Sequence, residues 1–219
     1  MKLIKYIDIS GKFDYDLYRS AQENGNKRKI DKVWASEEVV RKLSAFLKSN
    51  IRSLRFGLCH GTRRGKEQEW FSKYTDADFL GTEISETAIQ FPRTIQWDFH
   101  ETKSEWIGKV DAIYSNSWDH SYDPGKCFKG WLSCLSPGGI LLLEHTTYHC
   151  EDQVSQLDPF GIALDELVLF LTEIGQGDYS VVAVLRNLTN EERMSKIGLA
   201  VVVVRRHGPT VDLETWRSV

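Results

Sequence analysis

The stretch that decides the fold runs from Leu54 to Glu101 and reads LRFGLCHGTRRGKEQEWFSKYTDADFLGTEISETAIQFPRTIQWDFHE. It contains apolar runs of strand length at 79–84 and 94–99, and a first such run, 51–59, begins just before it. Residues 65–74 place three aromatic side chains on one helical face between the first two runs. A strand, a turn, a helix and a second strand form the unit from which parallel sheets are built.

The rest of the chain continues this alternation of strands and helices. The final two apolar runs have no helical stripe between them, so we expect them to pair antiparallel at one edge. The prediction is an α/β fold: a Rossmann-like, doubly wound sheet of seven strands, mostly parallel, with an antiparallel edge strand. The later strands are expected at 110–114, 140–144, 179–185 and 199–204, the later helices at 124–135 and 164–174, and a turn at 136–139.

The amino-terminal segment differs from the rest in composition. Residues 2–10 alternate loosely and predict a short strand or an extended arm, whereas 11–32 are polar. The polar part is interpreted either as a loop that orders over a ligand or as a solvated connector. Ser36 is a suitable N-cap for the first helix of the fold. We therefore expect an arm or lid at 1–35 and a Rossmann-like domain at 36–219.

Composition limits the classes of function. The chain has 219 residues, of which 41% are hydrophobic and 27% charged, with a formal net charge of −3. This balance predicts a sizeable core and argues against a broad basic face for nucleic acid. No apolar run is long enough to cross a membrane. The four cysteines form no CxxC pair and no signal peptide is visible, so the expected location is the cytoplasm.

The turn after the first strand, GLCHGTRRG at 57–65, is the first candidate binding element. Its glycines let the backbone approach a ligand, and the following helix amino terminus suits an anion. The glycine spacing matches neither GxGxxG nor the phosphate loop. Two interpretations stay open: a ligand-binding turn, in which Arg63 and Arg64 contact a carboxylate, or a tight strand–helix turn with two solvated arginines.

Two acidic residues at successive strand ends are the second candidate element. Glu83 follows Gly61 by about 20 residues, the spacing at which an acid accepts hydrogen bonds from ribose hydroxyls. Asp98 ends the next strand and is followed by Phe99. The alternative interpretation is that Glu83 caps a helix or is a surface acid and that Asp98 caps a turn.

The loops after the fourth and fifth strands carry the candidate catalytic side chains. Asp119 and His120 suit the deprotonation of a hydroxyl, and His145 suits a base or a substrate contact. Loops at the carboxyl ends of parallel strands face the same ligand crevice. Histidines, carboxylates and Asn116 are metal-ligand types, but no HExxH spacing appears, so no metal site is predicted.

Taken together, residues 36–206 resemble the class I S-adenosylmethionine-dependent methyltransferases. The resemblance rests on the strand order, Glu83, Asp98, the turn LSPGG at 135–139 and a degenerate form of the glycine-rich pattern. In that pattern Gly57 takes the acidic position, Cys59 and Gly61 take the first two glycines, and Arg63 takes the third.

The resemblance implies which residues hold the cofactor. S-adenosylmethionine would contact the turn at Gly57, Cys59, Gly61 and Arg63, with Asn116 beside the methyl donor. Glu83 would bind the ribose hydroxyls, Asp98 the adenine amino group, and Phe99 the adenine ring. The missing acid at Gly57 leaves the methionine half less well matched than the adenosine half.

The function implied is direct transfer of a methyl group to a small-molecule acceptor, assisted by His120 or His145. No nucleic acid or membrane partner is expected, and the oligomeric state is not readable from the sequence. One alternative is a catalytically inactive methyltransferase fold that binds a nucleoside as a regulator. Another is a NAD-dependent oxidoreductase, because Glu83 also fits the ribose of NAD; the absent GxGxxG argues against it.

Overall fold

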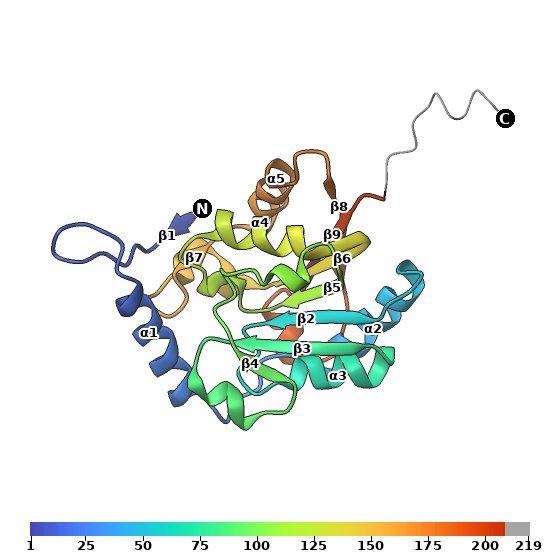
Figure 1. The fold of residues 1–219 in the computed structure, drawn as a ribbon, viewed down its shortest axis with the longest axis horizontal. Helices are drawn as coiled ribbons and strands as arrows, with labels where there is room; N and C mark the ends of the chain where they lie inside the picture. Colours follow the sequence, from blue (N-terminus) through green and yellow to red (C-terminus); the bar gives the residue numbers. More distant parts are fainter. Residues whose placement is uncertain (209–219) are drawn as a thin grey trace.

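A seven-stranded mixed sheet forms the centre of the protein, as seen in the computed structural model, which describes residues 1–208 (Figure 1). The strand order is β4-β3-β2-β5-β6-β9-β8; the first five strands are mutually parallel, and β9 pairs antiparallel with both of its neighbours, β6 and the edge strand β8. The predicted fold class is confirmed. The strands are β2 (Phe56–His60), β3 (Asp78–Glu83), β4 (Thr94–Gln96), β5 (Val110–Ser115), β6 (Leu135–His145), β8 (Tyr179–Arg186) and β9 (Ala200–Arg206).

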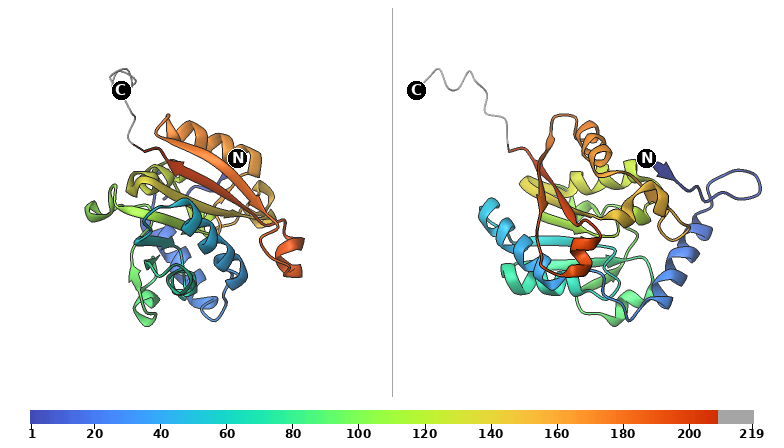
Figure 2. Two further views of the ribbon diagram at one scale, coloured as in Figure 1. Left: turned by 90° about the vertical axis from the view of Figure 1, so that its right-hand side faces the viewer. Right: turned by 180° about the vertical axis from the view of Figure 1, so that it is seen from behind.

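Helices cover both faces of the sheet, as the two views of Figure 2 show. Side chains alternate along each strand, so that Leu58 joins the core on one face and Cys59 the core on the other. One face packs against α4 (Pro124–Cys134) and α5 (Leu164–Gly175). The opposite face packs against α2 (Glu37–Asn50), α3 (Lys66–Thr75) and α6 (Glu192–Lys196). Burial on both faces explains the nearly continuous apolar runs of the central strands.

The predicted turn at 136–139 lies inside β6 instead of before it. The pairing of β5 with β6 passes from Val110–Leu135 to Ala112–Ile140, so the four intervening residues of β6 bulge from the ladder. A Cβ atom on Gly139 would lie 2.9 Å from the Ser136 carbonyl oxygen, which accounts for glycine there. The helix thus ends at Cys134, and the strand begins at the next residue.

The amino-terminal segment contains a helix that sequence reasoning missed. Residues 11–32, interpreted as a loop or connector, include α1 (Tyr15–Arg28), which begins with Asp14 accepting from the Leu17 backbone N–H. The prediction was wrong because α1 lacks an apolar stripe; it packs through Tyr18 and through polar side chains. Figure 1 shows α1 beside the carboxyl ends of β2 and β3.

A two-stranded sheet and several 3₁₀ helices lie outside the main sheet. β1 (Lys2–Leu3) pairs antiparallel with β7 (Phe160–Gly161) outside the main sheet. The described part of the chain also contains the 3₁₀ helices η1 (Glu86–Gln90), η2 (Ser104–Trp106), η3 (Trp118–His120), η4 (Thr147–His149) and η5 (Glu151–Gln153). Within residues 1–208, every helix is too short or too polar to span a bilayer.

Candidate functional site

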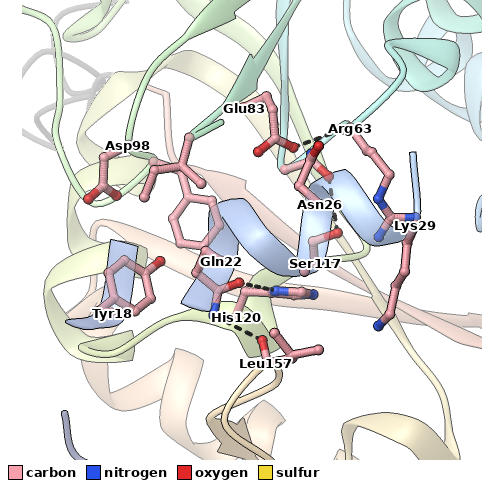
Figure 3. Close-up of a pocket in the computed structure, with 14 residues that line it drawn as sticks. Tyr18, Gln22, Asn26, Lys29, Arg63, Glu83, Asp98, Ser117, His120 and Leu157 are labelled. Atoms are coloured by element: carbon pink, nitrogen blue, oxygen red, sulfur yellow. Dashed lines mark hydrogen bonds between the residues drawn. The ribbon is translucent and has the colours of Figure 1, made fainter. Parts of the chain in front are cut away.

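A pocket opens at the carboxyl ends of the parallel strands and is closed on one side by α1 (Figure 3). Open α/β sheets bind their ligands at this edge. Six residues singled out from the sequence line it: Gly61, Arg63, Glu83, Asp98, Phe99 and His120. The remaining lining residues are Tyr18, Gln22, Gly25, Asn26, Lys29, Ile84, Ser117 and Leu157. We call this space the first pocket.

Glu83 is a buried carboxylate at the end of β3. Its Oε1 accepts from the Ser85 backbone N–H at 3.0 Å, and its Oε2 accepts from the Arg63 backbone N–H at 3.1 Å. Burial raises the pKa of Glu83, and these two backbone donors act against that rise. Each carboxylate oxygen keeps a free lone pair, so the group can still accept from two adjacent hydroxyls.

Asp98 follows β4 and is ionised at neutral pH. Its Oδ1 accepts from the His100 backbone N–H at 2.9 Å and lies 2.7 Å from His100 Nδ1, while Oδ2 accepts from the Tyr15 hydroxyl at 2.9 Å. Burial pushes the pKa of Asp98 upward, but the hydrogen bonds and charge of His100 outweigh it and hold the pKa below its usual value. The carboxylate is therefore a fixed acceptor beside Phe99.

The glycine-rich turn contributes only part of what was predicted. Gly61 has φ +73° and leaves no room for a side chain, because a Cβ would lie 2.7 Å from Ser117 Cβ. Gly57 and Cys59 do not line the pocket but lie within β2. A Cβ on Gly57 would lie 2.2 Å from the ring of Phe79, and Cys59 is fully buried in the core. The predicted contact of these two residues with a ligand is thus not supported.

A second pocket lies on the other side of the same turn and shares Gly61, Arg63 and Ser117 with the first. Its other lining residues are Lys32, Val33, Trp34, Thr62, Arg64, Lys66, Glu67 and Asn116. Asn116, predicted to bind the cofactor, lies here with its Nδ2 buried and without a partner. Glu67 Oε2 is likewise buried and unpaired, and burial raises the pKa of Glu67 to about 8.

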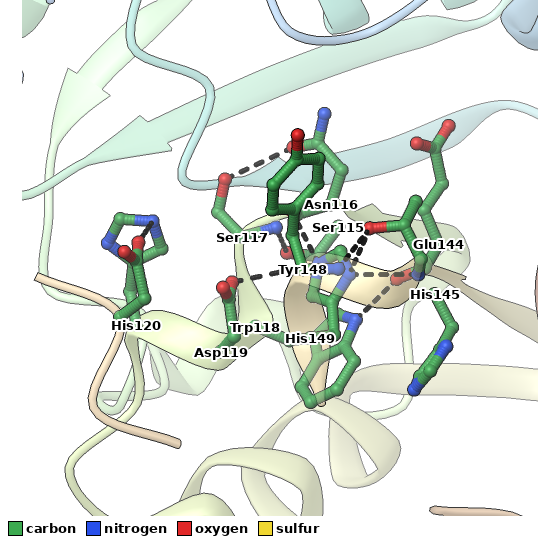
Figure 4. Close-up of polar contacts among 12 residues, drawn as sticks. Ser115, Asn116, Ser117, Trp118, Asp119, His120, Glu144, His145, Tyr148 and His149 are labelled. Carbon is green, nitrogen blue, oxygen red and sulfur yellow. Dashed lines mark hydrogen bonds and ion pairs between the residues drawn. The ribbon is translucent and has the colours of Figure 1, made fainter. Parts of the chain in front are cut away.

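The two histidines at the end of β6 and just beyond it are held by the backbone. His145 Nε2 lies 2.9 Å from the Ile162 carbonyl oxygen, and burial lowers the pKa of His145 to about 4. His149 Nδ1 accepts from the Thr146 backbone N–H at 2.9 Å. Figure 4 shows both rings beside Trp118, which stacks on them. His145 lines neither pocket, so the geometry does not support its predicted role as a base.

His120 is the one predicted catalytic side chain that borders the first pocket. Its Nδ1 lies 2.7 Å from Gln22 Oε1, and its Nε2 lies 3.3 Å from Asp158 Oδ1. The carboxylate beside His120 Nε2 is therefore that of Asp158, whereas the sequence indicates a pairing of His120 with Asp119. Asp119 precedes it on η3, and burial raises the pKa of Asp119 to about 7.

The side chains that α1 contributes were absent from the prediction. They recur at helical spacing along one face: Tyr18, Gln22, Asn26 and Lys29. An N-cap Asp14 followed by this polar stripe was the available signal, but a search for apolar periodicity does not detect it. Leu157 and Asp158 had no signal, because an irregular loop brings them to the site.

Neither a family model nor a curated protein matches this sequence. Solved structures do match it in fold. The plantazolicin methyltransferase BpumL, in complex with a pentazolic desmethylPZN analog and S-adenosylhomocysteine, superposes with TM-score 0.66 at 15% identity, over 88% of this chain and 96% of that one. The Burkholderia thailandensis 1,6-didemethyltoxoflavin-N1-methyltransferase, with 1,6-didemethyltoxoflavin and S-adenosylhomocysteine bound, gives TM-score 0.62 at 16% identity, over 88% of both chains.

A third match is not named as a methyltransferase. The [4+2]-cyclase SpnF superposes with TM-score 0.59 at 12% identity, over 77% of this chain and 81% of that one. At these identities the comparisons establish the architecture. The chain has the fold of the class I S-adenosylmethionine-dependent methyltransferases, with the seven-stranded sheet that the sequence predicted.

Proposed function

We propose that the protein binds S-adenosylmethionine and transfers its methyl group to a small-molecule acceptor. The observation that carries the proposal is the convergence of Glu83 and Asp98, from successive strand ends, on one pocket of a methyltransferase fold. Two of the structural neighbours are methyltransferases crystallised with S-adenosylhomocysteine, the product form of this cofactor.

The first pocket would hold the adenosine part of the cofactor. Glu83 offers two acceptor oxygens to the ribose diol, and Asp98 offers an ionised acceptor to the adenine amino group. Phe99 supplies an apolar surface beside them. Asn26 and Gln22 would contact the ligand from α1, so we propose that residues 1–35 act as a lid that excludes water.

The second pocket would hold the amino-acid end of the cofactor. Glu67 places a buried, unpaired carboxyl oxygen there, which suits the ligand ammonium group. Asn116 Nδ2 and the basic side chains of Arg63 and Arg64 suit its carboxylate. Glu67 would thus supply the carboxyl group that the chain lacks at Gly57, where the ring of Phe79 leaves no space.

The bound cofactor supplies an electrophilic methyl group on sulfur, and the protein contributes mainly by holding the reactants in line. The two pockets meet at Gly61 and Ser117, so the methyl group would lie near this junction. His120 borders the first pocket, so the acceptor would lie on the side of η3. That His120 acts as a general base stays a prediction. The same holds for the participation of Asp119 in deprotonating the acceptor.

Two other functions remain as alternatives. The match to the cyclase SpnF shows that this architecture is not confined to proteins named as methyltransferases, which supports a nucleoside-binding protein without methyl transfer. A NAD-dependent oxidoreductase would also use Glu83 for a ribose, but the turn at 57–65 lacks the GxGxxG that cradles a dinucleotide.

A thermal-shift comparison of S-adenosylhomocysteine with NAD⁺ tests the proposal. A ligand at one hundred times its Kd stabilises the folded state by about 2.7 kcal/mol, so binding should raise Tm by several degrees. We expect this shift with S-adenosylhomocysteine and none with NAD⁺. A shift with NAD⁺ alone would favour the oxidoreductase, and no shift with either would contradict the proposal.

A further inference from the structure

Three side chains at the rim of the first pocket bring ligand-type atoms together. Asp119, His120 and Asp158 each place one such atom within 4.8 Å of the others. The first two lie on the η3 turn after β5, as Figure 4 shows, and Asp158 comes from the loop that leads to β7. His120 also lines the first pocket, so the cluster borders the space proposed for the reactants.

The proton on His120 is located by Gln22. The Gln22 amide nitrogen donates to the Leu157 carbonyl oxygen at 3.0 Å, which turns Oε1 toward the imidazole. Since Oε1 only accepts, His120 Nδ1 at 2.7 Å must carry a proton. A neutral imidazole then presents a lone pair at Nε2, and that lone pair faces Asp158 Oδ1 at 3.3 Å. Two acceptors face each other there, and the contact is favourable only with a cation or a second proton between them.

Asp119 gives an independent indication of a missing positive charge. Its side chain is only 9% exposed, and its Oδ1 has no hydrogen-bond partner. The nearest basic atom is His149 Nε2 at 3.8 Å, which lies 3.3 Å from the Asn116 carbonyl oxygen instead. Buried carboxylate oxygens are normally satisfied, so an unpaired one in a ligand cluster indicates an absent partner.

We propose that Asp119, His120 and Asp158 bind a divalent first-row transition-metal ion. Two carboxylate oxygens and one imidazole nitrogen form a mixed O/N donor set that suits Mn²⁺ or Zn²⁺. The hydrogen bond from His120 Nδ1 to Gln22 is the kind of outer contact that orients a metal-bound imidazole. The sequence did not predict the site because Asp158 lies far along the chain from the other two ligands.

The ion would change the role of His120. A lone pair held by a metal cannot accept a proton, so His120 would act as a ligand and not as a base. Because His120 also lines the first pocket, an oxygen of a second molecule bound there would be a suitable further ligand for the ion. Binding of the ion does not require that the methyltransferase proposal be correct.

Titration of the metal-stripped protein with Mn²⁺, followed by electron paramagnetic resonance of the free ion, tests the site directly. We expect one Mn²⁺ per chain, and a loss of affinity of about tenfold or more in Asp158→Asn and in Asp119→Asn. The matched control is Asp152→Asn, which changes an exposed acid in the same segment and should bind like the wild type.

The alternative is a doubly protonated His120 that pairs with Asp158. Nitrogen NMR of the metal-free and Mn²⁺- or Zn²⁺-loaded protein distinguishes the two, because Zn²⁺ shifts Nε2 only if that atom is a ligand. Absence of stoichiometric Mn²⁺ binding, equal binding in all variants, or a His120 ring protonated on both nitrogens in the presence of Zn²⁺ would each overturn the proposal.

Discussion

Polar residues lie at the carboxyl ends of β3 and β4 and also at that of β6, but only those of β3 and β4 face the first pocket. At the end of β3 and just beyond that of β4, Glu83 and Asp98 are fixed by donors and still present oxygens to the first pocket. At the end of β6 and just beyond it, His145 and His149 are also fixed by hydrogen bonds, but these hold them inside the core. A polar residue at a strand end is thus a site residue only when its remaining hydrogen-bonding capacity faces open space.

Trp118 is the physical cause of the difference. Its ring is fully buried and stacks on His149 with centroids 4.8 Å apart, and its Nε1 donates to the Glu144 carbonyl oxygen at 2.6 Å. The ring fills the space that a ligand would need to reach His145. The carboxyl ends of β3 and β4 have no such residue, and α1 leaves a pocket over them.

The largest expected effect is on stability, from Trp118→Ala. Removing a fully buried tryptophan costs about 3–5 kcal/mol of the free energy of unfolding, because the cavity is only partly refilled. Urea denaturation measures it. Trp34→Ala is the control, since its ring is 37% exposed, and its effect should be clearly smaller. If both variants lose the same free energy of unfolding, Trp118 does not stabilise this region more than an exposed tryptophan does.

The next effect is on ligand affinity, from Asp98→Asn. A hydrogen bond to a charged group contributes about 1.5–3 kcal/mol, so the Kd for S-adenosylhomocysteine should rise about 10- to 100-fold. Glu105→Gln changes an exposed acid nearby and should leave the Kd unchanged. Calorimetric titration measures both values. If the two variants bind S-adenosylhomocysteine with equal affinity, Asp98 does not contact the adenosine part of the ligand.

A pH-dependent effect is expected from Glu67. Its pKa is about 8 in the folded protein against 4.5 as the model-compound value, so the folded state holds a proton that the unfolded state loses. Stability is therefore full below pH 4.5 and falls as pH rises toward 8. One such group changes stability by about 1.4 kcal/mol per pH unit, so Glu67→Gln should reduce the loss between pH 6 and 7.5 by about 2 kcal/mol.

Urea unfolding at the two pH values measures this difference. Glu69→Gln, on the same helix but exposed, should keep the wild-type dependence on pH. An identical slope for Glu67→Gln and wild type would show that Glu67 is already ionised in the folded protein.

The smallest effect is expected from His145→Leu. Loss of the donor to the Ile162 carbonyl oxygen should cost about 1–2 kcal/mol of stability. The Kd for S-adenosylhomocysteine should stay the same, because His145 lines neither pocket. Denaturation and calorimetry on the same preparation check both statements. A variant of normal stability with impaired binding would place His145 in the site after all.

The sequence predicted the sheet well because periodicity is a local property. Strands buried on both faces are continuous apolar runs, and the lack of a helical stripe between the last two runs indicated the antiparallel edge, although the structure places the short helix α6 between them. Glu83 and Asp98 were found for the same reason: Glu83 is the last residue of β3, and Asp98 lies two residues beyond the end of β4.

The parts of the site that the sequence did not predict depend on tertiary placement. The helix α1 is polar on its exposed and ligand-facing sides, so it carries no apolar signal. Asp158 reaches His120 through an irregular loop, and Gly57 lacks an acid because Phe79, from another strand, fills its space. Residue spacing shows neither the approach of Asp158 to His120 nor the packing of Phe79 against Gly57.

Calorimetric titration of S-adenosylhomocysteine into the wild type and Glu83→Gln tests the central claim most directly. Glu83→Gln keeps the size of the side chain but replaces one acceptor oxygen by a donor. We predict one ligand per wild-type chain and a Kd raised about tenfold or more in the variant, while Glu86→Gln, an exposed acid three residues on, binds normally. Equal affinity in all three proteins, or no binding to the wild type, would contradict the account.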